Sequence, residues 1–115
     1  MSMDAFEDLQ DWKKSTKHAV KSYSAVNDCK DYGLKDQVTR SAVSISSNTA
    51  AGHERNSRNQ FMYYLRIAKG SCGELHSQLD ICRDIGGIDK EDIRSFLERA
   101  GEISRMLQGL INHYR

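Results

Sequence analysis

Proline is absent from this sequence of 115 residues. Because proline lacks a backbone N–H and breaks helix interiors, its absence leaves the chain free to form long helices. Apolar residues recur at intervals of three and four rather than two, which is the spacing of one face of an α-helix. The sequence therefore predicts an all-α protein, and its length is that of a single domain spanning residues 1–115.

Long uncharged apolar runs are also missing, and no segment approaches the roughly 18 residues that a membrane span requires. The N-terminal stretch is acidic at Asp4, Glu7, Asp8 and Asp11, without the basic and apolar regions of a signal peptide. The three cysteines are an odd number and form no C-x-x-C motif, which does not fit a disulfide framework. We expect a cytoplasmic protein in a reducing compartment, with no membrane partner.

An excess of one charge sign is lacking too. The chain has 17 Lys and Arg residues against 16 Asp and Glu residues, a formal net charge of +1. The overall field therefore neither requires nor excludes a nucleic-acid partner, and such binding would need a local basic patch.

Start and stop signals divide the chain into four helices. The first opens at a capping box, with Asp4 as N-cap and Glu7 reaching back to it, and ends at "NDCKDYG". The second runs from about Leu34 to Ala51, with Gly52 as its expected terminator.

The third helix follows a second capping box, Ser57 with Gln60, and ends at Gly86-Gly87, and Asp89 caps the fourth helix. The residues expected to face a common core are Phe6, Leu9, Trp12, Thr16, Ala19, Val20, Tyr23 and Val26 in the first helix; Leu34, Val38, Ala42, Ile45 and Thr49 in the second; Phe61, Tyr64, Leu65, Ala68, Cys72, Leu75, Leu79 and Cys82 in the third; and Ile93, Phe96, Leu97, Ala100, Ile103, Leu107, Leu110, Ile111 and Tyr114 in the fourth. Four amphipathic helices joined by short turns predict an antiparallel up-down-up-down four-helix bundle.

Four apolar residues of the third helix fall outside its core stripe. A helical wheel places Met62, Tyr63, Ile67 and Ile81 on or beside an outward face. A row of exposed apolar side chains is typical of a partner surface, so these residues are candidates for an oligomer interface. The alternative is a core stripe wider than the wheel indicates.

Lysines gather on one side of the first helix, at Lys13, Lys14, Lys17 and Lys21. Such a row is able to contact phosphates. It equally fits a solvated face, or lysines paired with acids of a neighbouring helix or subunit.

Motifs for metal binding and catalysis are weak. Cys72 and His76 are spaced i, i+4, but structural zinc sites use closely spaced ligand pairs and four ligands, and the cysteines fit an apolar core better. The serines of the second helix lack the G-x-S-x-G context of a nucleophile and suit a close helix contact instead. We therefore expect no catalytic residue, no metal and no cofactor.

A basic cluster surrounds the turn between the second and third helices. Its members are Arg40, His53, Arg55, Arg58, Arg66 and Lys69. The N-terminus of the third helix adds a positive dipole end, and Tyr63 and Tyr64 offer rings for stacking on unpaired bases. The cluster is a candidate nucleic-acid surface, although a solvated turn with a core tyrosine explains the same residues.

Four motifs resemble one known family. The stretches "FEDLQDW", "LKDQVTRSAVSISSNTAAG", "FMYYLRIAKGSCGEL" and "RMLQGLI" are similar to those of the four-helix bundle proteins encoded in intervening sequences of bacterial 23S rRNA genes. These are sometimes labelled ribosomal proteins and are distantly like the accessory variability determinant of diversity-generating retroelements. The matching positions are Gln37, Arg40, Ser44, Ile45, Asn48, Gly52, Phe61, Leu65, Ala68, Gly70, Ser71, Glu74 and Leu75.

The resemblance implies a ring-like homopentamer with a role in binding nucleic acid. This chain departs from the family pattern at Thr39-Arg40, where two arginines are usual, and at Ala51, where an acid is usual. We expect a non-enzymatic homo-oligomer that binds structured RNA or DNA through the basic cluster. The alternative is a protein–protein interaction adaptor without nucleic-acid binding.

Overall fold

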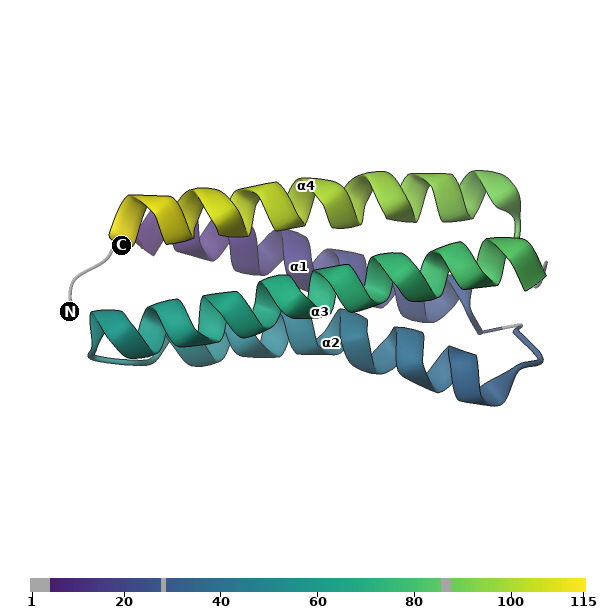
Figure 1. Ribbon diagram of the computed structural model, residues 1–115, viewed down its shortest axis with the longest axis horizontal. Helices are drawn as coiled ribbons and strands as arrows, with labels where there is room; N and C mark the ends of the chain where they lie inside the picture. The colour runs from purple at the N-terminus through teal and green to yellow at the C-terminus, as the bar shows by residue number, and fades with distance from the viewer. Residues whose placement is uncertain (1–4, 28, 86–87) are drawn as a thin grey trace.

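The computed structural model describes residues 5–27, 29–85 and 88–115, with the side chains of residues 5–9 left out. It contains the helices α1 (Ala5–Ala25), α2 (Tyr32–His53), α3 (Arg58–Ile85) and α4 (Lys90–Tyr114). Successive helices run in opposite directions (Figure 1), and within the described residues the backbone of each helix lies close to those of two neighbours. This confirms the predicted up-down-up-down bundle, which measures 45 × 21 × 18 Å.

Polar side chains cap three of the helices. Asp31 accepts the backbone N–H of Leu34 at 3.0 Å, so α2 begins earlier than predicted. Ser57 accepts the backbone N–H of Gln60 at 3.4 Å, and Asp89 accepts two first-turn N–H groups of α4 at 2.8 and 3.3 Å. The predicted caps of the third and fourth helices are confirmed.

The predicted terminator of the second helix is wrong, because α2 continues through Gly52 to His53. The expected cap Asp4 and the expected stop Gly86-Gly87 lie outside the described residues, as do the side chains of Phe6 and Leu9.

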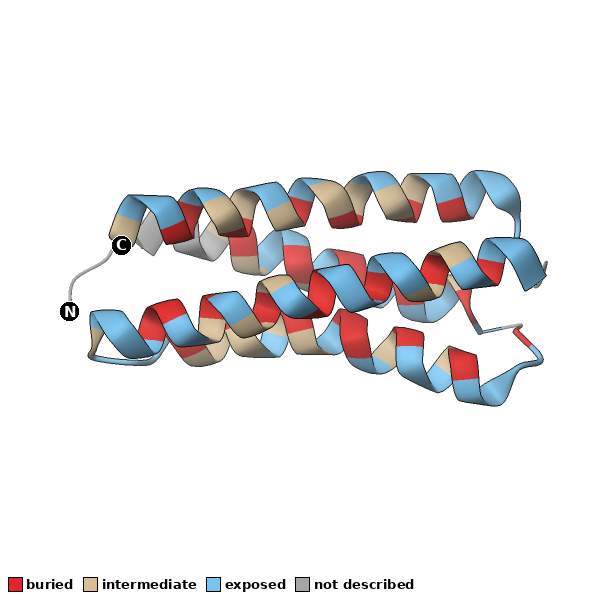
Figure 2. Ribbon diagram, in the orientation of Figure 1, coloured by how far each residue is buried: buried red, intermediate tan, exposed pale blue. Residues whose placement is uncertain are grey.

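The core lies between the facing sides of the helices, where Figure 2 shows the buried positions. All the predicted inward residues of α2 are buried, and so are those of α3 and α4 apart from the partly buried Tyr64, Leu97 and Tyr114. The hydrophobic effect of this burial drives assembly of the bundle. None of the helices, within the residues described, has an apolar stretch long enough to cross a bilayer.

Helix α1 turns inward a face that only partly matches the predicted one, because Ala19 and Val26 are buried as predicted and Trp12 and Thr16 are partly buried. Val20 and Tyr23 are 62% and 55% exposed, whereas Ser15, His18 and Ser22 are buried beside Ala19 and Val26. The inner face of α1 therefore combines small and polar side chains, and the apolar Val20 and Tyr23 remain in solvent. The helical wheel failed here because it assigned the core face by polarity, whereas the buried face of α1 contains two serines and a histidine.

The predicted outward face of the third helix is also corrected. Met62 is only 4% exposed, because α3 packs on both α2 and α4 and therefore buries a wider arc than one stripe. Ile67 is partly buried, whereas Tyr63 and Ile81 are 59% and 46% exposed. These two lie about 27 Å apart along the helix at 1.5 Å per residue, so they do not form one continuous patch.

Small residues line the contact between α2 and α3, as the serine pattern predicts. The hydroxyl oxygens of Ser44 and Ser71 are 2.8 Å apart, and the Asn48 side-chain amide donates to Ser44 Oγ at 2.9 Å. At Gly52 a Cβ atom would lie 3.1 Å from Cβ of Tyr64. The helices meet closely here because the side chains between them are small or absent.

Candidate nucleic-acid interface

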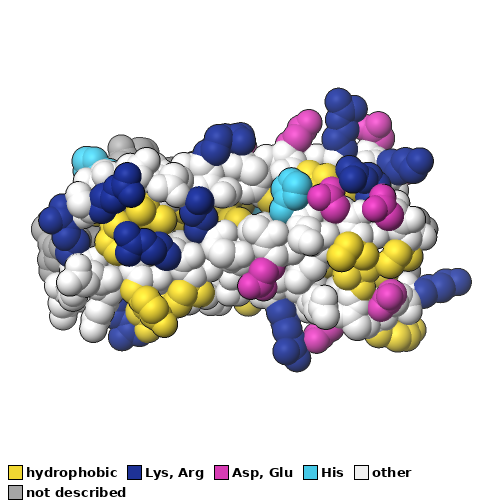
Figure 3. All heavy atoms as spheres, in the orientation of Figure 1, with side chains coloured by type: hydrophobic (Ala, Val, Ile, Leu, Met, Phe, Trp, Pro, Cys, Tyr) yellow, Lys and Arg dark blue, Asp and Glu magenta, His cyan; other side chains and the backbone are white. Residues whose placement is uncertain are grey.

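Acidic residues are absent from two adjacent helix segments. Residues 58–73 of α3 and 103–115 of α4 contain no Asp or Glu, and they carry the bases Arg58, Arg66, Lys69, Arg105 and Arg115. Because α3 and α4 are antiparallel neighbours, the two segments lie side by side at one end of the bundle. In Figure 3 the Lys and Arg side chains at this end have no Asp or Glu among them, whereas in the other half Lys and Arg are interspersed with Asp and Glu. A near-neutral chain therefore presents a strongly positive local surface.

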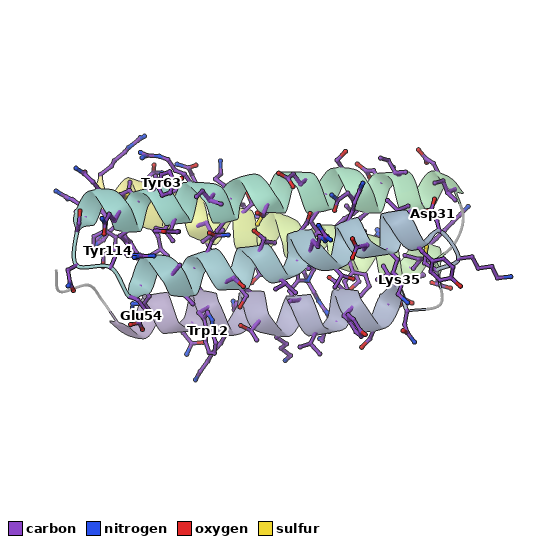
Figure 4. All side chains as sticks on the ribbon, turned by 90° about the horizontal axis from the view of Figure 1, so that it is seen from below. Trp12, Asp31, Lys35, Glu54, Tyr63 and Tyr114 are labelled. Atoms are coloured by element: carbon purple, nitrogen blue, oxygen red, sulfur yellow. The ribbon has the colours of Figure 1, made fainter. Side chains whose placement is uncertain are left out.

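Two adjoining hollows occupy the boundary between these segments. One, of about 520 Å³, is lined by Arg58, Arg66 and Arg115 together with Tyr63 and Tyr114, the two tyrosines that Figure 4 labels at this end. Both Arg66 and Arg115 also line the second hollow, of about 420 Å³.

Lys69 completes the lining of the second hollow. We call the surface formed by Arg58, Arg66, Lys69 and Arg115 the basic end. Among the described residues, no side-chain carboxylate lies within ion-pair distance of these four cations. Their charges are therefore not neutralised within the described bundle, and they face two hollows in the surface.

The turn residues of the predicted cluster are arranged differently. Arg55 stacks over the Tyr64 ring, with its guanidinium carbon 4.7 Å from the ring centroid, and Nη2 donates to the Tyr64 hydroxyl at 2.9 Å. His53 is the partly buried last residue of α2. Neither lines the two hollows, so Arg55 and His53 border the basic end rather than belong to it.

Arg40 lies apart from the rest of the predicted cluster. It precedes His53 by 13 positions on α2, which places it about 20 Å farther along the helix, and its Nε pairs with Asp36 at 3.0 Å. Arg115 takes its place in the charged surface. One feature of the sequence could have identified Arg115. The last 13 residues contain no Asp or Glu, and neither do residues 58–73 of the neighbouring helix.

The helix dipole adds less here than the sequence indicates. The N-termini of α1 and α3 lie at the same end of the bundle as the C-termini of α2 and α4. Helix termini carry about half a charge each, positive at the N-terminus and negative at the C-terminus, so these contributions oppose one another. The positive potential comes mainly from the arginine and lysine side chains.

The cysteines are core residues in this structure. Burial raises the pKa of the Cys72 thiol to about 12 and that of Cys82 to about 11. His76 is 3.4 Å from Asp80 through Nδ1. Among the residues described, no three His, Cys, Asp or Glu side chains gather closely enough to hold a metal ion.

These features define a small all-α bundle with one basic end. The sequence matches the model of the 23S rRNA-intervening sequence protein family over residues 7–109, and the chain belongs to this family. The resemblance inferred from the four motifs is thereby confirmed.

A crystal structure supports the same relationship. The chain is 27% identical to a protein of unknown function from the S23 ribosomal protein family of Bacteroides thetaiotaomicron, with a TM-score of 0.86. The likeness covers 92% of this chain and 98% of that one. No curated protein matches the sequence at a significant level.

Proposed function

We propose that this protein is a non-enzymatic, homo-oligomeric bundle that binds structured RNA or another nucleic acid through the basic end. The observation that carries the proposal is the pair of adjacent helix segments with five bases and no acid. Phosphate contacts from Arg and Lys supply most of the affinity of nucleic-acid binding. The planar guanidinium groups of Arg58, Arg66 and Arg115 are suited to bidentate contact with phosphate.

Tyr63 favours RNA with unpaired bases as the ligand. Tyr63 is 59% exposed and lines the same hollow as Arg58 and Arg66. Bases in loops and bulges stack on such rings. A stem-loop presents both a phosphate backbone and unpaired bases, so it matches the two chemical features of this surface.

We further propose that the assembly is a homopentamer, as the family resemblance implies. Exposed apolar side chains are available for subunit contacts, among them Tyr23 of α1 and Ile81 of α3. Linked copies of one weak site bind a long ligand with avidity. Light scattering at micromolar concentration is expected to give about five times the chain mass of 13.1 kDa, and a monomer mass would contradict this part of the proposal.

Binding of an RNA stem-loop across a salt series tests the nucleic-acid role. We expect affinity to fall steeply with salt. The double variant Arg58→Glu/Arg66→Glu is expected to lose at least about tenfold in affinity. It is also expected to reduce the slope of log affinity against log salt concentration by about 1.4–1.8, because each phosphate contact contributes roughly 0.7–0.9. The matched control is Arg83→Glu/Arg94→Glu, which makes the same charge change on α3 and α4 away from the basic end. Equal losses in both variants, or binding insensitive to salt, would refute the proposal.

The second candidate function is a protein-interaction adaptor. It is favoured by Val20 and Tyr23, which α1 leaves exposed beside each other on successive turns. A pull-down that recovers one protein partner with or without nuclease, and that Tyr23→Ser abolishes, would support the adaptor. Recovery that nuclease treatment eliminates would support RNA binding instead.

A further inference from the structure

A second positively charged site lies away from the basic end, in a groove between α1 and α4. The groove has a volume of about 230 Å³ and is lined by the cations Lys14, Lys17, Lys21 and Arg99, with His18 and Glu102. The three lysines follow the i, i+3, i+7 spacing of one helix face. We call this the α1–α4 groove.

His18 lines this groove but is itself only 2% exposed. Among the described residues, neither of its ring nitrogens has a hydrogen-bond partner. A neutral imidazole offers one donor and one acceptor, and leaving such groups buried without a partner destabilises the fold. Burying His18 without a partner therefore lowers the stability of the fold, so packing alone does not account for a histidine here. A polar ligand in the groove would supply the missing hydrogen-bond partner.

Positive charge accumulates around this histidine. Burial, followed by the charges of Arg99 and Lys21, lowers the pKa of His18 to about 4. The pKa of Lys21 is also lowered, by partial burial and then by Arg99 and Lys17. These cations repel one another, so the groove is most stable with an anion in it.

The groove contains too little negative charge to balance its cations. Its one lining carboxylate, Glu102, accepts a hydrogen bond from Lys14 Nζ at 2.9 Å. This ion pair confirms that one lysine of the first helix meets an acid of a neighbouring helix. Lys17, Lys21 and Arg99 have no carboxylate within ion-pair distance among the described residues.

We propose that the α1–α4 groove binds a phosphate dianion, either free or as the terminal group of a small phosphomonoester. A dianion offsets two of the three positive charges, those of Lys17, Lys21 and Arg99, that remain once Lys14 is paired with Glu102. Its oxygens accept from ammonium, guanidinium and imidazole donors together. The bound dianion favours protonation of His18, which then donates a hydrogen bond to it. The volume of the groove suits a phosphate with a short organic group rather than a nucleic-acid duplex.

Phosphate titration with histidine NMR tests this site. Inorganic phosphate is added to the whole protein at constant ionic strength, with sodium chloride as the comparison, and the His18 signals are assigned by replacing the other three histidines in turn. We expect saturable binding and a rise in the pKa of His18 from about 4 toward its ordinary value near 6.5. An equal response to sodium chloride, or an unchanged His18 pKa, would overturn the proposal.

Matched variants locate the binding. Arg99→Gln is expected to weaken phosphate binding by about tenfold, the usual effect of losing a charge-assisted hydrogen bond. The control Arg94→Gln removes the same charge from an exposed position of α4 outside the groove. This control is expected to change the affinity for phosphate less than twofold. Arg58→Glu/Arg66→Glu is expected to retain phosphate binding, which separates this site from the basic end. Loss of phosphate binding in that double variant, or equal effects of the two single ones, would refute the assignment.

The source of the phosphate is distinguished by comparing ligands. If ribose 5-phosphate binds more tightly than inorganic phosphate, the ligand of the groove is a small phosphomonoester. If inorganic phosphate binds more tightly, the ligand is the free ion. Inorganic phosphate and ribose 5-phosphate both failing to bind would overturn the proposal.

Discussion

Replacing Gly52 with alanine tests whether the close α2–α3 contact determines stability. The added Cβ atom would lie 3.1 Å from Cβ of Tyr64 and 3.3 Å from the carbonyl oxygen of Phe61. Neither neighbour is the flexible end of a side chain, so the two helices must separate slightly. Overpacking of this kind costs about 1–3 kcal/mol, and the gain in helix propensity is below about 1 kcal/mol because Gly52 is the penultimate residue of α2. We expect a net loss of about 1 kcal/mol.

The same substitution at open helical positions provides the control. At Gly73 and Gly109 an added Cβ would meet no atom within 4 Å beyond the adjacent residues and the nearby backbone of the same helix. Gly73→Ala and Gly109→Ala are therefore expected to raise stability by up to about 1 kcal/mol. The free energy of unfolding of all three variants is measured by urea titration, with circular dichroism reporting the helix content. All measurements use one protein concentration, because assembly shifts apparent stability. If Gly52→Ala proves as stable as the starting protein, the helices are not in tight contact there and the reasoning fails.

Three further predictions concern buried groups. Because the pKa of His18 is lowered to about 4, the unfolded chain binds more protons than the folded one between about pH 4 and 6.5, so urea unfolding is expected to show stability falling by up to about 3 kcal/mol over that range as pH is lowered. A His18→Gln variant that shows the same fall would contradict this assignment. Cys72 and Cys82, whose thiol pKa values are raised by burial, are expected to react with iodoacetamide at pH 8 only after unfolding, and fast labelling of the folded protein by mass spectrometry would be contrary evidence. Ser71→Ala removes the 2.8 Å hydroxyl contact with Ser44 and is expected to cost about 1 kcal/mol in urea unfolding, whereas an unchanged midpoint would show that this contact contributes nothing.

The fold was predictable because three helices follow a simple rule. In α2, α3 and α4 most of the apolar residues fall on the buried side of the helix, so periodicity locates most of the core. Helix α1 was not predictable in this way, because its buried face combines Ala19 and Val26 with serines and a histidine, and only packing decides which arc turns inward. Met62 was misplaced for a related reason: a helix with two partners buries more than one stripe.

The candidate site was predicted only in part. Arg58, Arg66 and Lys69 are close together on one helix, so their spacing shows that they share a region. Arg115 is distant in sequence and joins them only because α4 returns to the start of α3. Arg40 was included by proximity in sequence, but about 20 Å of straight helix separates it from the turn.

The uneven charge along the α3–α4 face has a consequence for assembly. Residues 74–102 carry eight acidic and four basic residues, opposite in balance to the acid-free segments beside them. In the proposed cyclic oligomer the subunits are related by rotation about one axis. Every basic end therefore lies at the same height and radius of the ring, and the like charges repel. A polyanion across the basic ends removes the repulsion, which links ring stability to ligand by mass action. The oligomer would then be least stable in dilute salt without nucleic acid and most stable with nucleic acid bound. The ligand would in that case be part of the quaternary structure.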